Sequence, residues 1–212
     1  MKIRRPALYG ASAMLVLTAG CSSEPSLREQ YPVQWKTCDD LFGVKNMTDV
    51  RDMFGDDQEI LNRPITVDEM ANGLKREARE RYDQVRGFDD YDVCHLDGRS
   101  VFWAAVGWSA RSLKQVSDPS GRWHPVGPDA FVNGGIYGGG STVAVFRCEV
   151  AGAAKGRQVQ ILLEVSLNDV GIPKSTDEFE AQLVAKLAQS VRDAVGCVNR
   201  PEIPEGLSPT KA

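Results

Sequence analysis

The segment Val101-Phe102-Trp103-Ala104-Ala105-Val106-Gly107-Trp108 is apolar at nearly every position. Successive side chains of a β-strand point to opposite faces, so this run predicts a central strand that is covered on both sides. We expect that strand to continue to Ala110. Asp97-Gly98, just before it, predicts a two-residue hairpin turn, and Tyr91–Leu96 predicts the strand that pairs with it.

Two further strands and two long helices are predicted around this hairpin. The strands are at 142–150 and 158–167, and the second alternates apolar and polar residues, which indicates one buried face. The helices are at 66–87 and 175–196. Each begins with a Ser/Thr-x-x-Glu capping box, continues with apolar residues at helical spacing and ends at a glycine.

The order of these elements predicts an α+β fold. We expect an antiparallel sheet of four or more strands packed against an N-terminal and a C-terminal helix, in the order α-β-β-long loop-β-β-α. The long loop covers residues 112–141 without regular structure, as is typical of a functional or mobile segment. The predicted domain spans 35–198, between a flexible tether at 21–34 and a disordered tail at 199–212.

Four widely spaced cysteines, Cys38, Cys94, Cys148 and Cys197, favour disulfides over a zinc site. The strand after Cys148 and the closing helix have similar expected lengths, about 33 Å and about 30 Å. Cys197 should therefore return to the end of the sheet where Cys148 lies. This geometry favours Cys148–Cys197 and, by elimination, Cys38–Cys94. A cross-strand Cys94–Cys148 disulfide is the main alternative.

The N-terminal residues predict export. Lys2, Arg4 and Arg5 precede an apolar run, Ala7–Ala19, which as a helix reaches only about 20 Å against a hydrocarbon core of about 30 Å. Residues 1–20 therefore have the features of a signal peptide rather than a membrane span.

Leu17-Thr18-Ala19-Gly20-Cys21 matches a lipobox, in which the cysteine is lipidated and becomes the first mature residue. Two or more acyl chains anchor a protein stably. We therefore expect a chain that is attached to the outer face of the cell membrane through Cys21. An ordinary signal peptide followed by a chance cysteine is the alternative.

The charge of the chain argues against two classes of partner. The formal charge is −4, and it becomes −7 without the leader, whose charged residues are the three basic ones named above. Nucleic-acid binding requires clustered basic residues, so no nucleic-acid partner is expected. Electrostatic attraction to anionic lipid is also weak, which leaves the lipid anchor as the membrane attachment.

No motif for catalysis, a metal or a cofactor is recognisable. The two histidines, His95 and His124, are not part of H-E-x-x-H, and no G-x-S-x-G is present. We therefore expect no catalytic residue, no metal and no cofactor. Aromatic and polar residues in and near the long loop are the candidates for ligand binding, although Trp108 would also suit the core: Trp108, Trp123, His124 and Tyr137.

Several motifs together resemble a family. The lipobox, Trp35-x-x-Cys38-x-x-Leu41, Ala144-x-Phe146-x-Cys148 and the terminal Gly196-Cys197 resemble those of uncharacterised actinobacterial cell-envelope lipoproteins. The resemblance covers most of the mature domain. It implies an extracytoplasmic location and disulfides, and it implies no catalytic residues.

These observations favour a non-enzymatic envelope lipoprotein that presents a sheet-and-loop surface to a protein, a peptide or a small envelope ligand. The alternative is a cell-wall hydrolase or other envelope enzyme that uses His124 with a nearby carboxylate such as Asp118 or Asp129. A purely structural or assembly role is a third hypothesis.

Overall fold

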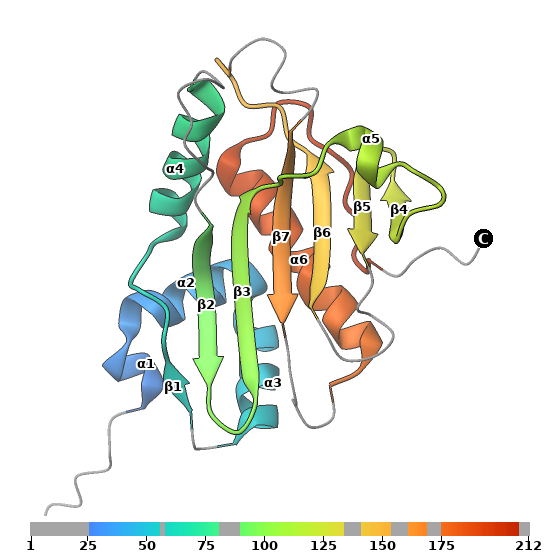
Figure 1. Cartoon of the computed structure of the whole chain (residues 1–212). Coiled ribbons are helices and arrows are strands. Elements are labelled where there is room, and N and C mark those ends of the chain that lie inside the picture. The colour runs from blue at the N-terminus through green and yellow to red at the C-terminus, as the bar shows by residue number, and fades with distance from the viewer. Residues whose placement is uncertain are drawn as a thin grey trace, which may run out of the picture.

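The computed structural model describes residues 26–55, 58–80, 90–133, 141–153, 161–168 and 175–207. Within these residues, the centre is a seven-stranded antiparallel sheet in the order β1-β2-β3-β7-β6-β5-β4 (Figure 1). Four of the strands (β2, β3, β6 and β7) correspond to the predicted ones. The strands are β1 (Glu59–Ile60), β2 (Tyr91–Asp97), β3 (Val101–Trp108), β4 (Trp123–Gly127), β5 (Ala130–Asn133), β6 (Thr142–Arg147) and β7 (Leu162–Asn168).

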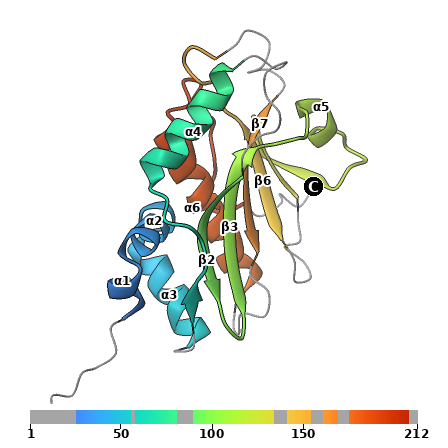
Figure 2. The same cartoon turned by 60° about the vertical axis from the view of Figure 1, so that its left-hand side comes forward.

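Helices pack mainly on one face of this sheet. Figure 2 shows α2, α3, α4 and α6 on one side and the short α5 on the other. The α+β class with helices on an antiparallel sheet is therefore confirmed, although the observed order contains more elements than predicted. The described helices are α1 (Leu27–Gln30), α2 (Pro32–Phe42), α3 (Val44–Phe54), α4 (Val67–Arg79), α5 (Leu113–Val116) and α6 (Asp177–Val195).

β3 lies inside the sheet between β2 and β7, as its apolar sequence predicts. Phe102, Ala104 and Val106 belong to the core between the sheet and the helices and are at most 1% exposed. Alternation places Trp103 and Ala105 on the other face, where Trp103 is half-buried. The side chains on one face of the strand therefore lie in the main core, and those on the other face are less completely buried.

The β2–β3 hairpin differs from the prediction at its turn. Asp97 pairs with Val101, so the loop is the three residues 98–100 rather than a two-residue turn at Asp97-Gly98. A β-bulge lies between Asp92 and Cys94. A bulge shifts the alternation of the side chains by one residue. As a result, Cys94 faces the helices, where a disulfide partner is available.

Capping interactions set the ends of the two long helices. At α4, Thr66 Oγ1 accepts from the Glu69 N–H at 3.2 Å, and the Glu69 carboxylate accepts from the Thr66 N–H at 2.8 Å, as the capping box predicts. At α6 the N-cap is Thr176 rather than the predicted Ser175, because Thr176 Oγ1 accepts from the Phe179 N–H. The prediction that α4 extends to Gly87 lies outside the described residues.

The stretch 112–141 is not a structureless loop. It contains α5, β4 and β5, and the last two form a hairpin across Pro128-Asp129 in which Gly127 pairs with Ala130. These strands have only four or five residues, and Pro125 lies within β4. Proline is tolerated there because β4 is at the edge of the sheet.

The predicted tether also contains regular structure. α1 lies within 21–34, and its N-cap Ser26 forms a capping box with Glu29. Pro32 does not mark a linker but occupies the first turn of α2, a position where a helix tolerates proline. Tyr31, between the two helices, packs against the core.

The predicted disordered tail packs against the domain through residue 207. Ile203 and Leu207 are buried, the Leu207 N–H donates to Ala181 O at 3.3 Å, and Gln189 Nε2 donates to Ile203 O at 3.1 Å. The segment packs along α6 because these two apolar side chains can be buried beside the helix.

Both disulfides have the pairing that the sequence favours. Cys38 on α2 is bonded to Cys94 on β2, and Cys148 after β6 is bonded to Cys197 after α6. The alternative Cys94–Cys148 disulfide is incompatible with the sheet order, because β3 and β7 lie between β2 and β6. Three strand spacings amount to about 14 Å, whereas a disulfide spans less than about 7 Å between Cα atoms.

Candidate functional site

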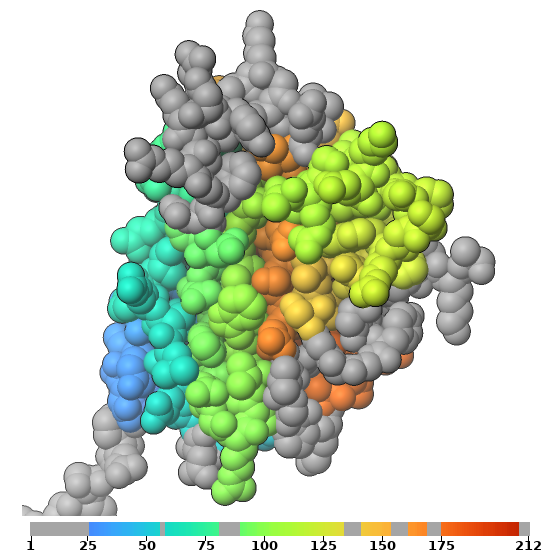
Figure 3. All heavy atoms as spheres, viewed as in Figure 1, coloured from blue at the N-terminus to red at the C-terminus, as the bar shows by residue number. Residues whose placement is uncertain are grey.

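The sheet face opposite the main helices is the first candidate surface. A row of paired residues crosses five strands on this face: Ala105, Ser166, Val143, Asn133 and Trp123. The row has small or medium side chains over β3, β7, β6 and β5, and ends at an indole ring on β4. Figure 3 shows β7 and β6 reaching the surface between β3 and the α5–β4 segment. We call this strip the open sheet face.

α5 forms one border of the open sheet face. It lies over a small apolar cluster, separate from the main core, formed by Val116, Phe131, Val145 and Leu162. Trp123 packs against the same cluster. Because these residues come from α5, β5, β6 and β7, their packing holds the border against the sheet.

Arg111 joins this border to the middle of the sheet. Its Nη1 donates to Glu164 Oε2 on β7 at 3.0 Å, and Ser109 Oγ donates to the same oxygen at 2.5 Å. The guanidinium carbon lies 5.4 Å from the centre of the Trp123 ring, within cation–π range. Trp123 is therefore held by a side chain that is itself anchored by a carboxylate.

The four candidate ligand-binding residues do not form one site. Trp123 borders the open sheet face, whereas Trp108 is 6% exposed and its Nε1 donates to Leu74 O at 3.0 Å, which makes it a core residue. His124 is exposed and, by alternation along β4, lies on the opposite face from Trp123. Tyr137 lies outside the described residues.

The geometry around His124 gives no support to the hydrolase alternative. Asp118 accepts hydrogen bonds from the Ser120 hydroxyl and N–H at 2.7 and 2.9 Å, and these bonds lower its pKa. Asp129 lies in the β4–β5 turn, where its carbonyl accepts from the Arg147 N–H. Among the described residues, neither carboxylate forms a hydrogen bond or ion pair with the His124 imidazole.

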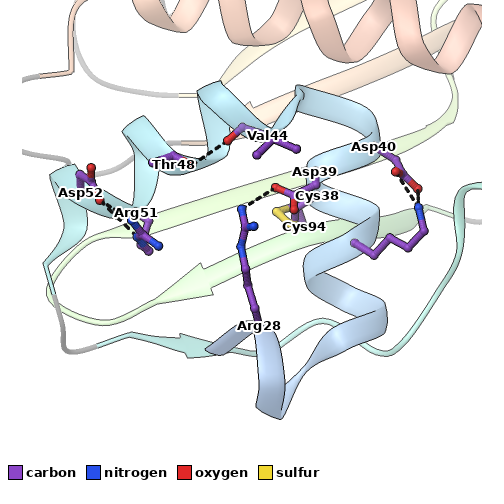
Figure 4. A network of polar contacts seen from close by, with 10 residues as sticks. Arg28, Cys38, Asp39, Asp40, Val44, Thr48, Arg51, Asp52 and Cys94 are labelled. Carbon is purple, nitrogen blue, oxygen red and sulfur yellow. Dashed lines mark hydrogen bonds and ion pairs between the residues drawn. A yellow bond between two sulfur atoms is a disulfide. The ribbon is translucent and has the colours of Figure 1, made fainter. Parts of the chain in front are cut away.

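A second candidate surface is a groove of about 890 Å³ between α1, the start of α2, the end of α3 and β1. We call it the N-terminal groove. Its residues include Arg28 from α1, Arg51 and Asp52 from α3, and Gln58 and Glu59 at β1. Figure 4 shows Arg28 extending from α1 toward Asp39, with Arg51 and Asp52 on the neighbouring helix.

Arg28 in the N-terminal groove contacts both an acidic and an aromatic side chain. Its Nη2 lies 3.2 Å from Asp39 Oδ1, and its guanidinium carbon lies 5.3 Å from the centre of the Trp35 ring. Burial raises the pKa of the Asp39 carboxyl, and the positive charge of Arg28 opposes that rise. The Arg28 side chain is nonetheless 41% exposed, so its remaining N–H donors are accessible.

No sequence signal pointed to the N-terminal groove. Its residues come from four separate elements, and five of the eleven lie in the range expected to be a tether. The closest signal was the Trp35-x-x-Cys38 spacing, which indicated only that a fold begins there. The groove exists because α2, which contacts α1 and α3, packs on β2, the strand that pairs with β1, and this arrangement depends on packing over long sequence distances.

In the part of the chain that the structure describes, no three His, Cys, Asp or Glu side chains are grouped so that they could hold a metal ion. None of the described helices has both the length and the apolar character needed to cross a bilayer. In comparisons with known proteins, no family model, no curated protein and no solved structure matches the chain.

Proposed function

We propose that this chain is a lipoprotein of the actinobacterial type, anchored through Cys21 to the outer face of the cell membrane. On this proposal it is a non-enzymatic module that binds an envelope protein, peptide or small ligand through the open sheet face and its α5–β4 border. The two disulfides support an exported location, because disulfides persist mainly in oxidising compartments.

The main observation behind the binding role is the uneven cover of the sheet. The helices bury one face, whereas the other keeps half-buried Val143, Asn133 and Ser166 between Trp103 and Trp123. Binding sites commonly combine aromatic side chains with a few polar groups on rigid elements. These residues lie on paired strands, so the surface is preorganised.

Anchoring and binding need separate tests. Labelling with radioactive palmitate should mark the wild-type chain and not Cys21→Ala, and the variant should leave the membrane fraction. An unlabelled wild-type chain would refute the anchor.

For binding, a photo-cross-linking amino acid is placed at Val143 and, as a control, at the exposed Lys186 on α6. Irradiation of intact cells should give a discrete adduct from position 143 only. Trp123→Ala should lower its yield while the chain stays folded, as its circular dichroism spectrum would show. Equal adducts from both positions would refute this surface.

A further inference from the structure

The chemistry of the N-terminal groove is independent of the open sheet face. Among the acidic and basic residues that line it, Arg28 and Arg51 oppose Asp52 and Glu59, so the lining has no net formal charge. Arg28 is already paired with Asp39 at 3.2 Å, and Arg51 Nη2 with Asp52 at 2.9 Å. An anion would have to compete with these carboxylates, and a cation would meet the two guanidinium groups.

One groove residue leaves an acceptor unused. Gln58 is 9% exposed, and its Nε2 donates to Arg51 O at 3.1 Å and also to Gly55 O, which fixes the orientation of the amide. Its Oε1 is buried without a hydrogen-bond partner. Unpaired buried acceptors are uncommon in folded proteins and call for an explanation, such as a ligand or an ordered water.

The Trp35 indole supplies a second underused group. Its Nε1 is buried without a partner of standard hydrogen-bond geometry, although its hydrogen-bonding interaction with Asp39 helps to lower the pKa of that carboxyl. The proximity to Asp39 makes this N–H a weaker argument for a ligand than the Gln58 oxygen, which has no such neighbour. Both residues line the groove, and Tyr31 adds a further aromatic side chain.

A ligand that satisfies this lining must both donate and accept hydrogen bonds. Guanidinium groups only donate and carboxylates only accept, whereas a hydroxyl group does both. Adjacent hydroxyls of a sugar can therefore accept from Arg51 and donate to Glu59, and a hydroxyl is also the kind of donor that the Gln58 oxygen lacks. A phosphate would compete with the carboxylates for the guanidinium groups, and an acyl chain would cover these polar groups without a hydrogen bond to any of them.

We propose that the N-terminal groove binds a neutral, hydroxyl-rich sugar or polyol. The source of that sugar depends on the proposed lipid anchor. Ser26 and Leu27 line the groove, and the five peptide bonds from Cys21 to Ser26 span at most about 18 Å. An acylated Cys21 therefore keeps the groove close to the bilayer surface, where the sugar is either a glycolipid headgroup or a saccharide of the wall.

The test uses the full chain with Cys21→Ser, which carries no acyl anchor, so that failure of the anchoring proposal does not affect the result. Methyl glucoside, methyl mannoside and myo-inositol are titrated against it by calorimetry and ligand-detected NMR. In a second arm, co-flotation is measured with phosphatidylcholine vesicles that contain either a glucosyl diacylglycerol or phosphatidylglycerol.

We expect saturable binding of at least one free sugar, with little dependence on salt because the lining is neutral. Arg51→Met and Glu59→Gln, both at exposed side chains, should each weaken it about tenfold, as expected for the loss of a hydrogen bond to a charged group. Lys45→Met, on the same helix but outside the groove, should leave it unchanged.

The flotation arm distinguishes the two possible sources of the sugar. Co-flotation with the glucosyl lipid identifies a glycolipid headgroup, whereas binding of free sugar without co-flotation identifies a wall saccharide, and either supports the proposal. Absence of sugar binding overturns it. So does binding restricted to phosphatidylglycerol vesicles and abolished by salt, since that result would identify an anionic ligand.

Discussion

Removal of the Cys38–Cys94 disulfide should cause a loss of stability whose size follows from the length of the loop that the bond closes. Both cysteines are fully buried, and their bond joins α2 to β2 across 56 residues of sequence. A cross-link over a loop of that length lowers the entropy of the unfolded chain enough to contribute about 4 kcal/mol at 25 °C. Cys38→Ala/Cys94→Ala avoids buried polar groups, so the expected loss is of that size.

Urea unfolding, monitored by circular dichroism, measures the difference in the free energy of unfolding between the wild type and the double variant. For a domain of this size, about 4 kcal/mol corresponds to a fall in melting temperature of about 8–16 °C. The second disulfide is a matched control, because Cys148 and Cys197 are 49 residues apart and chain entropy predicts nearly the same loss.

Several results would refute this reasoning. A loss below about 1 kcal/mol with an unchanged m-value would show that loop closure does not determine the contribution of the bond. A large difference between the two double variants would point to packing rather than chain entropy. Peptide mapping that linked Cys94 to Cys148 would refute the sheet order itself.

Three further predictions concern packing and pH. Gly73→Ala would place a methyl group 2.1 Å from the Tyr91 hydroxyl oxygen, and urea unfolding should show a loss of about 1–3 kcal/mol; an unchanged midpoint would disprove this close approach. Hydrogen bonds from Thr66 lower the Glu69 pKa below 4.5, so its stabilisation is present above pH 4.5 and is lost as the pH falls through the folded pKa. Glu69→Gln should flatten that acid limb in thermal unfolding, and a wild-type-like limb would exclude the capping box as its cause. Burial raises the Asp39 pKa above 3.8, so its favourable contribution is present below pH 3.8 and is lost as the pH rises through the folded pKa. The melting temperature of Asp39→Asn should therefore rise relative to wild type over that range, and a constant difference would contradict the shift.

The parts of the fold that could be predicted from the sequence have signals within a few adjacent residues. The apolar run of β3 indicated a central strand, and Thr66 and Glu69 indicated the start of α4 through a direct mutual contact. The pairing of Cys148 with Cys197 followed from matching lengths of strand and helix. For β3 and α4 the signal lies within one short segment, whereas the disulfide could be assigned because the two predicted elements between its cysteines have matching lengths.

The missed elements depend on partners that are distant in sequence. β4 is only five residues long and contains Pro125, and it is a strand because β5 pairs with it and β6 pairs with β5. Ile203 lies in a Pro-rich segment that has no periodicity of its own. It is buried because α6 offers an apolar surface beside it. Local composition cannot report such a surface.

The same dependence on distant partners limits how far the candidate sites could be predicted from the sequence. Trp123 could be proposed from its aromatic, loop-like context, but Trp108 has the same residue type and lies in the core, because its strand is central rather than at the edge. The N-terminal groove depends on how α1 and α3 meet β1. Gln58 illustrates the difficulty, since its unused oxygen becomes visible only when the partners of its Nε2 are known.

The covalent links and the main core lie on the same side of the sheet. Cys38–Cys94 fastens the helix layer at β2, and Cys148–Cys197 fastens it beyond β6, on the other side of β3 and β7. The helix layer is thus held at two separated places, and most of the buried side chains lie beneath it. The open sheet face and the N-terminal groove contribute few of those side chains. Substitutions of their exposed residues should therefore change binding with little effect on unfolding, because the stability of the domain resides in the layer between helices and sheet.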